Sequence, residues 1–287
     1  MSAVVTLAVD AMGGDHGLPV TVPAVARILA RHPDLNVIMV GEPSALAPAL
    51  KKEHLDDHAR VTVAPASEVV AMDDPVTVAL RQKKDSSMRV AINQVKEGRA
   101  LAAVSAGNTG ALMAVSRFVL KTLPGVDRPA ICTAIPHDKG HCHMRDLGAN
   151  VDSEPKHLLQ FALMGQAVVR AVDGLSAPRV SLLNIGEEDI KGNEQIKDAA
   201  ALMQQADNLN YVGFVEGNGI FLGDVDVVVC DGFVGNVSLK TMEGAASMIG
   251  GMIREEAGRS LLRKLSGLFA LPLLRGLKRR LDPERYN

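Results

Sequence analysis

Short apolar runs alternate with longer stretches of helical spacing along most of the chain. The apolar runs predict buried strands at 4–9, 35–40, 61–64, 101–105, 130–135, 144–147, 180–185, 211–215 and 225–230. The longer stretches predict helices at 19–31, 86–97, 109–120, 154–172, 193–205 and 234–257. Strands that alternate with helices favour a mostly parallel sheet covered by helices on both faces. We therefore predict a single α/β catalytic domain over residues 1–287.

Local signals and composition add detail to this picture. Asp74 and Pro75 predict a further helix start, with the aspartate as N-cap and the proline at the first helical position. Aromatic residues make up only 3% and Trp is absent, so the core must be aliphatic. The three cysteines, Cys132, Cys142 and Cys230, lack CxxC spacing, which favours a reducing, cytoplasmic compartment. We expect neither a signal peptide nor a transmembrane helix.

The segment 254–281 differs from the rest of the chain. It carries an apolar stripe before Pro272, at which we expect a break or kink, and every charge between Arg259 and Arg280 is positive. The stripe consists of Leu261, Leu262, Leu265, Leu268 and Phe269. This pattern is typical of a protruding basic amphipathic helical hairpin on anionic lipid. A helix pair packed on the sheet or on a second subunit fits equally well.

Charge is distributed unevenly between this segment and the body. Residues 251–287 contain nine Lys or Arg and four Asp or Glu, whereas the rest of the chain contains 22 and 29. An acidic body with a basic tail indicates an anionic surface or partner for the tail. The body is not expected to bind nucleic acid.

Glycine-rich loops follow many of the predicted strands, where ligands gather in parallel α/β sheets. The loops lie at 10–15, 105–110, 146–150, 184–188, 216–219 and 231–236. Small residues let the backbone approach a ligand, and a following helix offers N–H groups at its positive end, which together favour phosphate binding. No loop matches GxGxxG or GxxxxGK[ST], so a dinucleotide fingerprint and a P-loop are not supported.

Two loops are the strongest candidates for chemistry. In the first, Ser105, Gly107, Asn108 and Thr109 are candidates for binding phosphate, although a helix capped by Asn108 or Thr109 explains the string equally well. In the second, Asn236 at a helix start is a candidate oxyanion donor. Lys240, one turn later, would neutralise phosphate or be an ordinary solvated residue. The full set of candidate substrate-binding residues is Asp10, Gly13, Gly14, Asp15, Ser105, Gly107, Asn108, Thr109, Gly110, Asn150, Gly186, Asp231 and Gly235.

Other chemistries find less support. His137, His141 and His143 surround Cys142 in HDKGHCH, but this spacing matches no established zinc pattern, and a glycine loop entering a strand fits better. We therefore expect no metal and no cofactor. The chain has no GxSxG string, and Cys230 is expected to be a packing residue, so a covalent acyl-enzyme is not supported.

Motifs along the whole chain resemble the acyl-acyl-carrier-protein:phosphate acyltransferases of the PlsX type. The matching strings are VDAMGGD at 9–15, SSM at 86–88, SAGNTGALM at 105–113, DRPA at 127–130, DLGANVD at 146–152, LLNIGEEDIKGNE at 182–194, DGFVGNVSLKTMEG at 231–244 and LKRRLDPERYN at 277–287. Members of that family continue for several tens of residues beyond RYN with a Gly-rich stretch, which we expect to be missing here.

The resemblance implies a Rossmann-like three-layer α/β/α fold similar to isocitrate dehydrogenase and phosphotransacetylase. It implies a cytoplasmic homodimer, peripherally associated with the membrane, that converts acyl-acyl carrier protein and inorganic phosphate to acyl phosphate in bacterial phospholipid synthesis. Asn236, Lys240 and Lys191 are its candidate catalytic residues, and Asp10 and Asp15 are expected to organise the first loop. The candidate carrier-binding residues are Arg81, Lys83, Lys84 and Arg89, for which a solvated face is the alternative. A phosphotransacetylase-like enzyme using acyl-coenzyme A, or a non-catalytic scaffold, is the rival interpretation.

Overall fold

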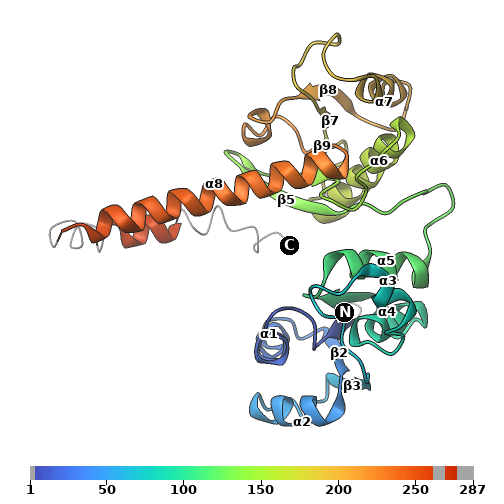
Figure 1. Ribbon diagram of the computed structural model, residues 1–287, viewed down its shortest axis with the longest axis vertical. Coiled ribbons are helices and arrows are strands. Elements are labelled where there is room, and N and C mark those ends of the chain that lie inside the picture. Colours follow the sequence, from blue (N-terminus) through green and yellow to red (C-terminus); the bar gives the residue numbers. More distant parts are fainter. Residues whose placement is uncertain (1–3, 261–268, 277–287) are drawn as a thin grey trace. The chain divides into compact units, whose positions relative to one another are not determined.

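The protein forms two compact α/β units, each with its own sheet. The computed structural model describes residues 4–260 and 269–276 (Figure 1). Unit 1 comprises Met1–Pro124 and unit 2 comprises Gly125–Asn287. Two sheets thus form where the sequence analysis expected one, and the expectation of a single domain stays a prediction.

Unit 1 is built on a parallel sheet with the strand order β3-β2-β1-β4. Its elements are β1 (Val5–Asp10), α1 (Leu18–Arg31), β2 (Leu35–Gly41), α2 (Pro43–Lys52), β3 (Val61–Pro65), α3 (Val76–Arg81), α4 (Ser87–Lys96), β4 (Ala102–Ser105) and α5 (Thr109–Leu120). Successive residues of β2 point to opposite faces. Val37 and Met39 therefore pack with α1 and α2, whereas Ile38 and Val40 pack with α4. Helices cover both faces, as predicted.

Unit 2 contains a mixed sheet with the strand order β5-β6-β9-β7-β8. Its elements are β5 (Cys132–His137), β6 (Gly140–Arg145), α6 (Pro155–Val172), β7 (Val180–Leu183), α7 (Glu194–Gln204), β8 (Tyr211–Val215), η1 (Gly219–Phe221), β9 (Val227–Val229) and α8 (Gly232–Gly258). Strands β5 and β6 are antiparallel, and the other pairs are parallel.

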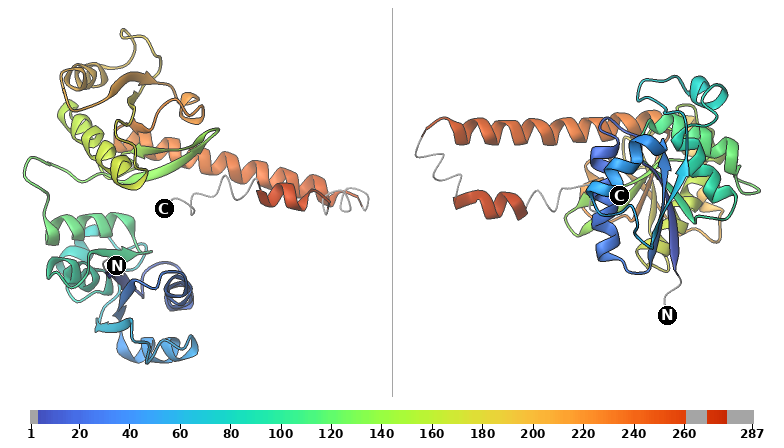
Figure 2. Two further views of the ribbon diagram at one scale, coloured as in Figure 1. Left: turned by 180° about the vertical axis from the view of Figure 1, so that it is seen from behind. Right: turned by 90° about the horizontal axis from the view of Figure 1, so that it is seen from below.

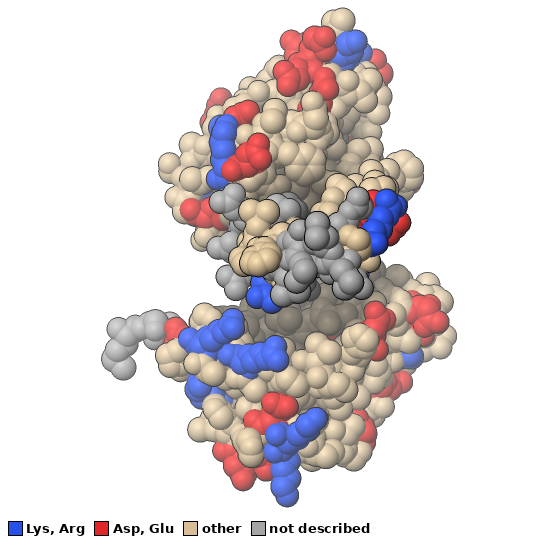
Figure 3. Space-filling view, turned by 90° about the vertical axis from the view of Figure 1, so that its left-hand side faces the viewer, with Lys and Arg blue, Asp and Glu red and all other residues tan. Residues whose placement is uncertain are grey.

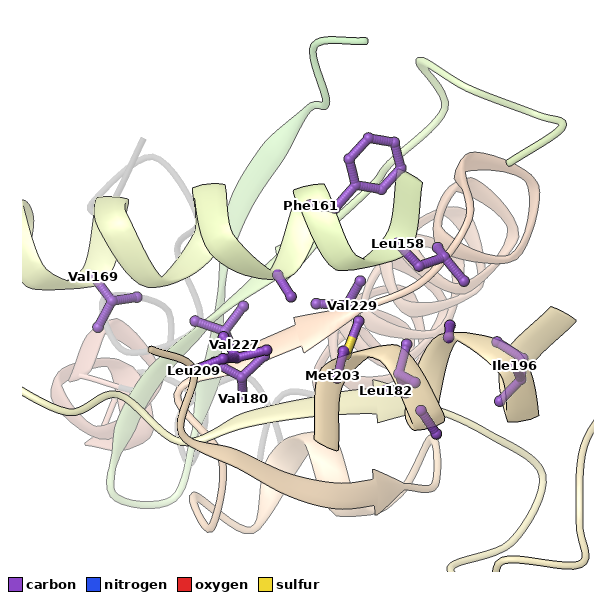
Figure 4. Close-up of a cluster of buried hydrophobic side chains, with 13 residues drawn as sticks. Leu158, Phe161, Val169, Val180, Leu182, Ile196, Met203, Leu209, Val227 and Val229 are labelled. Carbon is purple, nitrogen blue, oxygen red and sulfur yellow. The ribbon is translucent and has the colours of Figure 1, made fainter. Parts of the chain in front are cut away.

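The core of unit 2 is aliphatic on both faces of this sheet. On one face, α6 and α7 cover β7 and β9 through Phe161, Met203, Leu182 and Val229 (Figure 4). On the other face, Leu239 of α8 packs against a cluster that includes Met144, Val228 and Cys230. The first turns of α8 are thereby fixed on the sheet, next to the ends of β6 and β9.

Beyond those turns, α8 extends away from the sheet (Figure 2), and its apolar side chains are exposed. Its 27 residues include Met248, Ile249, Met252 and Ile253, whose exposed fractions are 56%, 54%, 56% and 39%. Residues 269–276 are helical as well, so the helix passes through Pro272, where the sequence analysis expected a break or kink. No helix among residues 4–260 and 269–276 is long and apolar enough to span a membrane.

Part of the predicted hairpin lies outside the described residues. This applies to Leu261, Leu262, Leu265 and Leu268, whereas Phe269 is described and is 86% exposed. The amphipathic hairpin therefore stays a prediction.

Most predicted strands and helices are confirmed to within two residues, but three local predictions were wrong. The strand expected at 144–147 runs from Gly140 to Arg145 and forms an antiparallel hairpin with β5. The helix start at Asp74 and Pro75 is one residue later, with Pro75 itself as the N-cap. Helix α2 was not predicted, and it contains Pro48 in its interior.

Candidate functional site

The first candidate loops of unit 1 meet at the ends of β1 and β4. These strands are parallel neighbours, and Asp10 is paired with Ser105 in their register. The Ser105 hydroxyl donates a hydrogen bond of 2.7 Å to Asp10 Oδ2. Asp10 Oδ1 accepts from the N–H groups of Met12 at 3.3 Å and Gly13 at 3.1 Å. The buried Asp10 carboxylate therefore holds the glycine turn after β1 against the end of β4.

Close backbone approach explains the glycines of these two loops. A Cβ atom on Gly13 would lie 2.5 Å from Asp10 Oδ2 and 3.0 Å from Ser105 Oγ. A Cβ atom on Gly107 would lie 3.1 Å from Ser105 Oγ and 3.6 Å from Gly13 Cα. Gly14 has a φ of +90°, and a Cβ atom built on it would lie 3.0 Å from the Ala106 carbonyl oxygen. A side chain would thus be strained at Gly13 and Gly14, whereas one at Gly107 would require only small shifts of its neighbours.

The start of α5 has the geometry of a capped helix. Asn108 is the N-cap, and its Oδ1 accepts from the Ala111 N–H at 3.0 Å. Its amide nitrogen donates to the carbonyl oxygens of Met72 and Asp74, at 2.9 and 3.2 Å. Asn108 is therefore held in place by three bonds within the protein. Thr109 and Gly110, the next two residues, are exposed at the positive end of the helix.

A buried carboxylate also organises the corresponding loop of unit 2, which follows β6. Asp146 is fully buried. It accepts from the backbone N–H groups of Ile131, Leu147 and Asn150 at 2.9, 2.7 and 2.7 Å, and from the Asn150 side chain at 2.9 Å. A hydrogen-bonded loop of this kind lets a charge be buried without a counter-ion. Sequence reasoning quoted this loop but did not single out Asp146.

The first turn of α8 is fitted against that loop. Asp231 is its N-cap and accepts from the Val234 N–H at 2.9 Å. The Gly232 N–H donates to the Asn150 carbonyl oxygen at 2.8 Å. A Cβ atom on Gly235 would lie only 1.8 Å from the carbonyl oxygen of Asp146, so no side chain can be accommodated there. The glycine fixes the distance between the helix and the loop.

Asn236 follows Gly235 on the exposed side of this turn. A Cβ atom built on Gly148 would lie 3.5 Å from Asn236 Cβ and 3.7 Å from its Oδ1, so the asparagine sits beside the Asp146 loop. Lys240, also exposed, lies one turn further and forms an ion pair of 2.8 Å with Glu243. An exposed pair of this type contributes little, so it leaves the ammonium accessible.

The loop after β7 is closed by Asn184. Its amide nitrogen donates to the carbonyl oxygens of Gly186 at 3.0 Å and Lys191 at 3.3 Å. A Cβ atom on Gly186 would lie 2.8 Å from Lys191 Cγ, so the lysine stem covers the buried glycine while Lys191 as a whole stays exposed.

Two of the four basic residues that are candidates for carrier binding, Lys83 and Arg89, already bind to other groups of unit 1. Lys83 forms an ion pair with Asp74 and donates to the Val69 carbonyl oxygen, and its hydrogen bond lowers the pKa of Asp74. Arg89 donates to a backbone carbonyl and stacks over Phe118, 5.2 Å from the ring centroid. Arg81 and Lys84 are exposed. The face shown in Figure 3 carries basic side chains beside acidic ones.

The cysteines and histidines differ from one another in their surroundings. Cys230 is buried, and its sulfur lies 3.4 Å from the Asp146 carbonyl oxygen. Burial raises the pKa of the Cys142 thiol to about 12 and that of Cys230 further still, so neither is an effective nucleophile at neutral pH. His141 and His143 both lie on β6 rather than in a loop, and both contact Asp173.

The structure thus gathers the predicted residues into two groups. Asp10, Gly13, Gly14, Ser105 and Gly107 meet in unit 1, whereas Asn150, Asp231, Gly235 and Asn236 meet in unit 2. Gly186 and Lys191 belong to a separate loop of unit 2, and Asp15 is exposed. That both groups serve one active site stays a prediction.

Known proteins match the chain over almost its full length. A family model described as "Fatty acid synthesis protein" matches residues 5–287. A phosphate acyltransferase of Alcanivorax borkumensis is 78% identical over 284 residues, covering 99% of this chain and 84% of the relative. A phosphate acyltransferase of Cupriavidus metallidurans is 61% identical over 284 residues, covering 99% and 79%.

Solved structures share the fold at much lower identity. A phosphotransacetylase of Staphylococcus aureus gives a TM-score of 0.62 at 17% identity, over 86% of this chain and 82% of that chain. A branched-chain phosphotransacylase of Enterococcus faecalis gives a TM-score of 0.55 at 17% identity, over 83% and 84%. These likenesses confirm the predicted phosphotransacetylase-like α/β fold. The close relatives and the family model support an acyltransferase of fatty acid or phospholipid synthesis, and the chain belongs to the fatty acid synthesis protein family.

Proposed function

We propose that the enzyme transfers a fatty acyl group from acyl carrier protein to inorganic phosphate, which yields an acyl phosphate and free carrier. The observation that carries this proposal is the 78% identity, over 99% of the chain, to a phosphate acyltransferase. The two groups of loop residues support it, because each combines glycines with the positive end of a helix. The reaction would belong to bacterial phospholipid synthesis.

The unit 1 loops are the proposed phosphate site. The first N–H groups of α5 have no backbone carbonyl one turn earlier that could accept a hydrogen bond. The side chain of Asn108 accepts from the N–H of Ala111. The N–H groups of Thr109 and Gly110 are thus oriented to bind an anion. Ser105 already donates to Asp10 and accepts from the Gly107 N–H at 3.1 Å, so its role is to position the loop.

The start of α8 is the proposed oxyanion site. A phosphate oxygen would attack the thioester carbonyl carbon, forming a C–O bond as the C–S bond breaks and the thiolate leaves with the carrier. The Asn236 amide would donate to the carbonyl oxygen as its negative charge develops, supported by the helix N-terminus. Lys240 and Lys191 would supply positive charge. Because thiolate is a good leaving group, orientation and electrostatics can carry this reaction.

Carrier protein and membrane are the proposed macromolecular partners. Arg81 and Lys84 are exposed and available to an acidic carrier surface. Phe269 and Leu273 are 86% and 75% exposed and lie one helical turn apart, which suits insertion into an anionic bilayer. The apolar face of α8 around Met248 and Met252 suits a second copy in a homodimer. The enzyme would be cytoplasmic and peripherally bound.

The donor separates this proposal from its rival, a phosphotransacetylase-like enzyme. The test supplies phosphate with either acyl-acyl carrier protein or the matching acyl-coenzyme A and measures acyl phosphate formed. We expect product from the carrier thioester at much higher kcat/KM. Product from acyl-coenzyme A alone would support the rival, and none from either would support a non-catalytic scaffold.

A vesicle assay tests the membrane partner. Replacing Phe269 and Leu273 with Glu should weaken binding to phosphatidylglycerol vesicles about a hundredfold, since each apolar side chain contributes about 1.5 kcal/mol or more. The matched control replaces Leu101 and Leu123, two exposed residues of unit 1, with Glu. Unchanged vesicle binding by the first variant, or a loss of its dimer instead, would contradict the proposed membrane contact.

A further inference from the structure

Two histidines of β6 and an aspartate that follows α6 form a compact cluster in unit 2. His141 and His143 are two residues apart on one strand, so their side chains project from the same face. Asp173 is the C-cap residue of α6. Its Oδ1 lies 3.1 Å from His141 Nε2, and its Oδ2 lies 2.9 Å from His143 Nε2. The imidazole rings are edge to face, with centroids 5.1 Å apart.

The spacing of these atoms matches the requirements of a small divalent ion. Each residue offers one ligand atom, and all three atoms lie within 4.8 Å of one another. A tetrahedral zinc site, with bonds of about 2.0–2.1 Å, places its ligand atoms about 3.3 Å apart. His141 lies 3.1 Å from Oδ1 and His143 lies 2.9 Å from Oδ2, so an ion between the two rings would be held by both carboxylate oxygens, or by one of them after the side chains shift slightly.

The surroundings also favour coordination. Cys132 of β5 lies across the sheet from this part of β6, and its sulfur is 3.8 Å from His143 Nδ1. Nε2 of His143 donates to the Asp173 carboxylate while no ion is bound, and the ring would have to move this proton to Nδ1, beside the Cys132 sulfur, when Nε2 binds an ion. The side chains of His143, Asp173 and His141 are 8%, 19% and 23% exposed, so the cluster is largely shielded from solvent without being fully buried.

We propose that His141, His143 and Asp173 bind one divalent transition-metal ion of the zinc type, through the two Nε2 atoms and the carboxylate. The ion would join the β5–β6 hairpin to the end of α6. Helix α6 follows the Asp146 loop and ends at Asp173, so the cluster lies at the opposite end of that helix from the loop. The role that we assign to the ion is to stabilise the packing of this hairpin against α6.

The test uses the full chain without an affinity tag, stripped with a chelator and desalted. Calorimetric titration with zinc chloride should show one tight ion per chain and a raised unfolding midpoint. Titration with Co²⁺ should give the intense visible absorption of a four-coordinate site with imidazole ligands. Asp173→Asn, which keeps the shape of the side chain, and His141→Gln should each weaken zinc binding by at least about tenfold. His32→Gln, at an exposed histidine of unit 1, is the matched control.

Two results would overturn the proposal. The first is a native chain that binds no stoichiometric zinc and gives no Co²⁺ band, which would make the cluster a hydrogen-bonded link alone. The second is equal zinc binding by the native chain, Asp173→Asn and His141→Gln, which would place the ion elsewhere. Because the native titrations do not depend on any variant, a variant that fails to fold leaves the test decisive.

Discussion

The loop after β1 in unit 1 and the loop after β6 in unit 2 are both held by a buried aspartate, but the hydrogen-bond donors to that aspartate differ. In each, a buried aspartate at the end of a strand accepts backbone N–H groups and shapes a glycine turn. Asp10 shares its carboxylate with the Ser105 hydroxyl, which can rotate. All of the donors that Asp146 accepts from are amide N–H groups, and its own carbonyl oxygen faces Gly235.

This difference in donors indicates which loop can better accommodate a substitution of its aspartate. A hydroxyl both donates and accepts, so the unit 1 loop can adjust to an altered partner. An amide N–H only donates, so each N–H group that faces residue 146 in the unit 2 loop requires an acceptor there. We infer that the unit 2 loop is the more rigid of the two, and that it sets the position of Asn236.

The largest effect is expected at Gly235. A methyl group there would overlap the Asp146 carbonyl oxygen, which a Cβ atom would approach to 1.8 Å. Gly235→Ala should therefore lower the free energy of unfolding of unit 2 by about 3 kcal/mol or more, as measured by chemical denaturation. Gly244→Ala, in open space on the same helix, should stabilise by about 0.5–1 kcal/mol. Equal stability of the two variants would show that α8 can move away from the loop.

The next effect is expected at Asn236. If its amide donates to the oxyanion, Asn236→Ala should lower kcat by about two to three orders of magnitude. The side chain is exposed, so the denaturation midpoint should change little. Lys240→Ala is the comparison on the same helix and should lower kcat less, because Lys240 lies one turn further from the helix N-terminus and is exposed to solvent, which screens its charge. Unchanged turnover for Asn236→Ala would rule out the oxyanion role.

Substitution of the two aspartates compares the loops directly. In Asp146→Asn, the new NH₂ group must face backbone donors, which should cost about 2–3 kcal/mol of unfolding free energy. In Asp10→Asn, the NH₂ group can donate to Ser105 Oγ once the hydroxyl rotates, so we expect a loss below about 1 kcal/mol. A greater loss for Asp10→Asn would reverse the proposed order of rigidity.

The smallest effect concerns Gly107. Gly107→Ala places a methyl group 3.0 Å from the flexible end of Met88 and 3.1 Å from Ser105 Oγ, so the fold should adjust. We expect the KM for phosphate to rise about tenfold, equivalent to about 1.4 kcal/mol, with the KM for the carrier substrate unchanged. Gly217→Ala, which meets no atom within 4 Å, is the control. An unchanged KM for phosphate would show that this loop is only structural.

Local patterns in the sequence predict the strands and helices of this chain well. They fail where contacts with other residues determine whether a helix forms or where it begins. Hydrophobic spacing alone predicts Thr109–Leu120 and Tyr211–Val215 to the residue. Asp74 does not cap α3, because its carboxylate bonds the Ala71 N–H and Lys83 instead. Helix α2 is missed because Pro48 argues against it locally, although burial of Leu46 and Leu50 outweighs that cost.

The same limit applies to the sites. A glycine-rich string after a strand indicates that a backbone must come close to something, which the sequence shows for Gly13, Gly107 and Gly235 without naming the neighbour. Most of the hydrogen bonds to Asp146 come from residues within four positions of it, so that aspartate could have been found from its place after a buried strand, although the bond from Ile131 could not. Asp173 lies 30 residues beyond His143, and no local spacing marks it as a partner.

The most direct test of the central claim is a kinetic comparison of acyl phosphate formation from acyl-acyl carrier protein by the native enzyme, Gly107→Ala and Asn236→Ala. The concentration of each substrate, phosphate or acyl-acyl carrier protein, is varied while the other substrate is kept at a saturating concentration. We predict that Gly107→Ala raises the KM for phosphate with little change in kcat, and that Asn236→Ala lowers kcat with little change in that KM. If the native enzyme forms no acyl phosphate, or if both variants change the same parameter, the assignment of phosphate binding to unit 1 and oxyanion stabilisation to unit 2 is wrong.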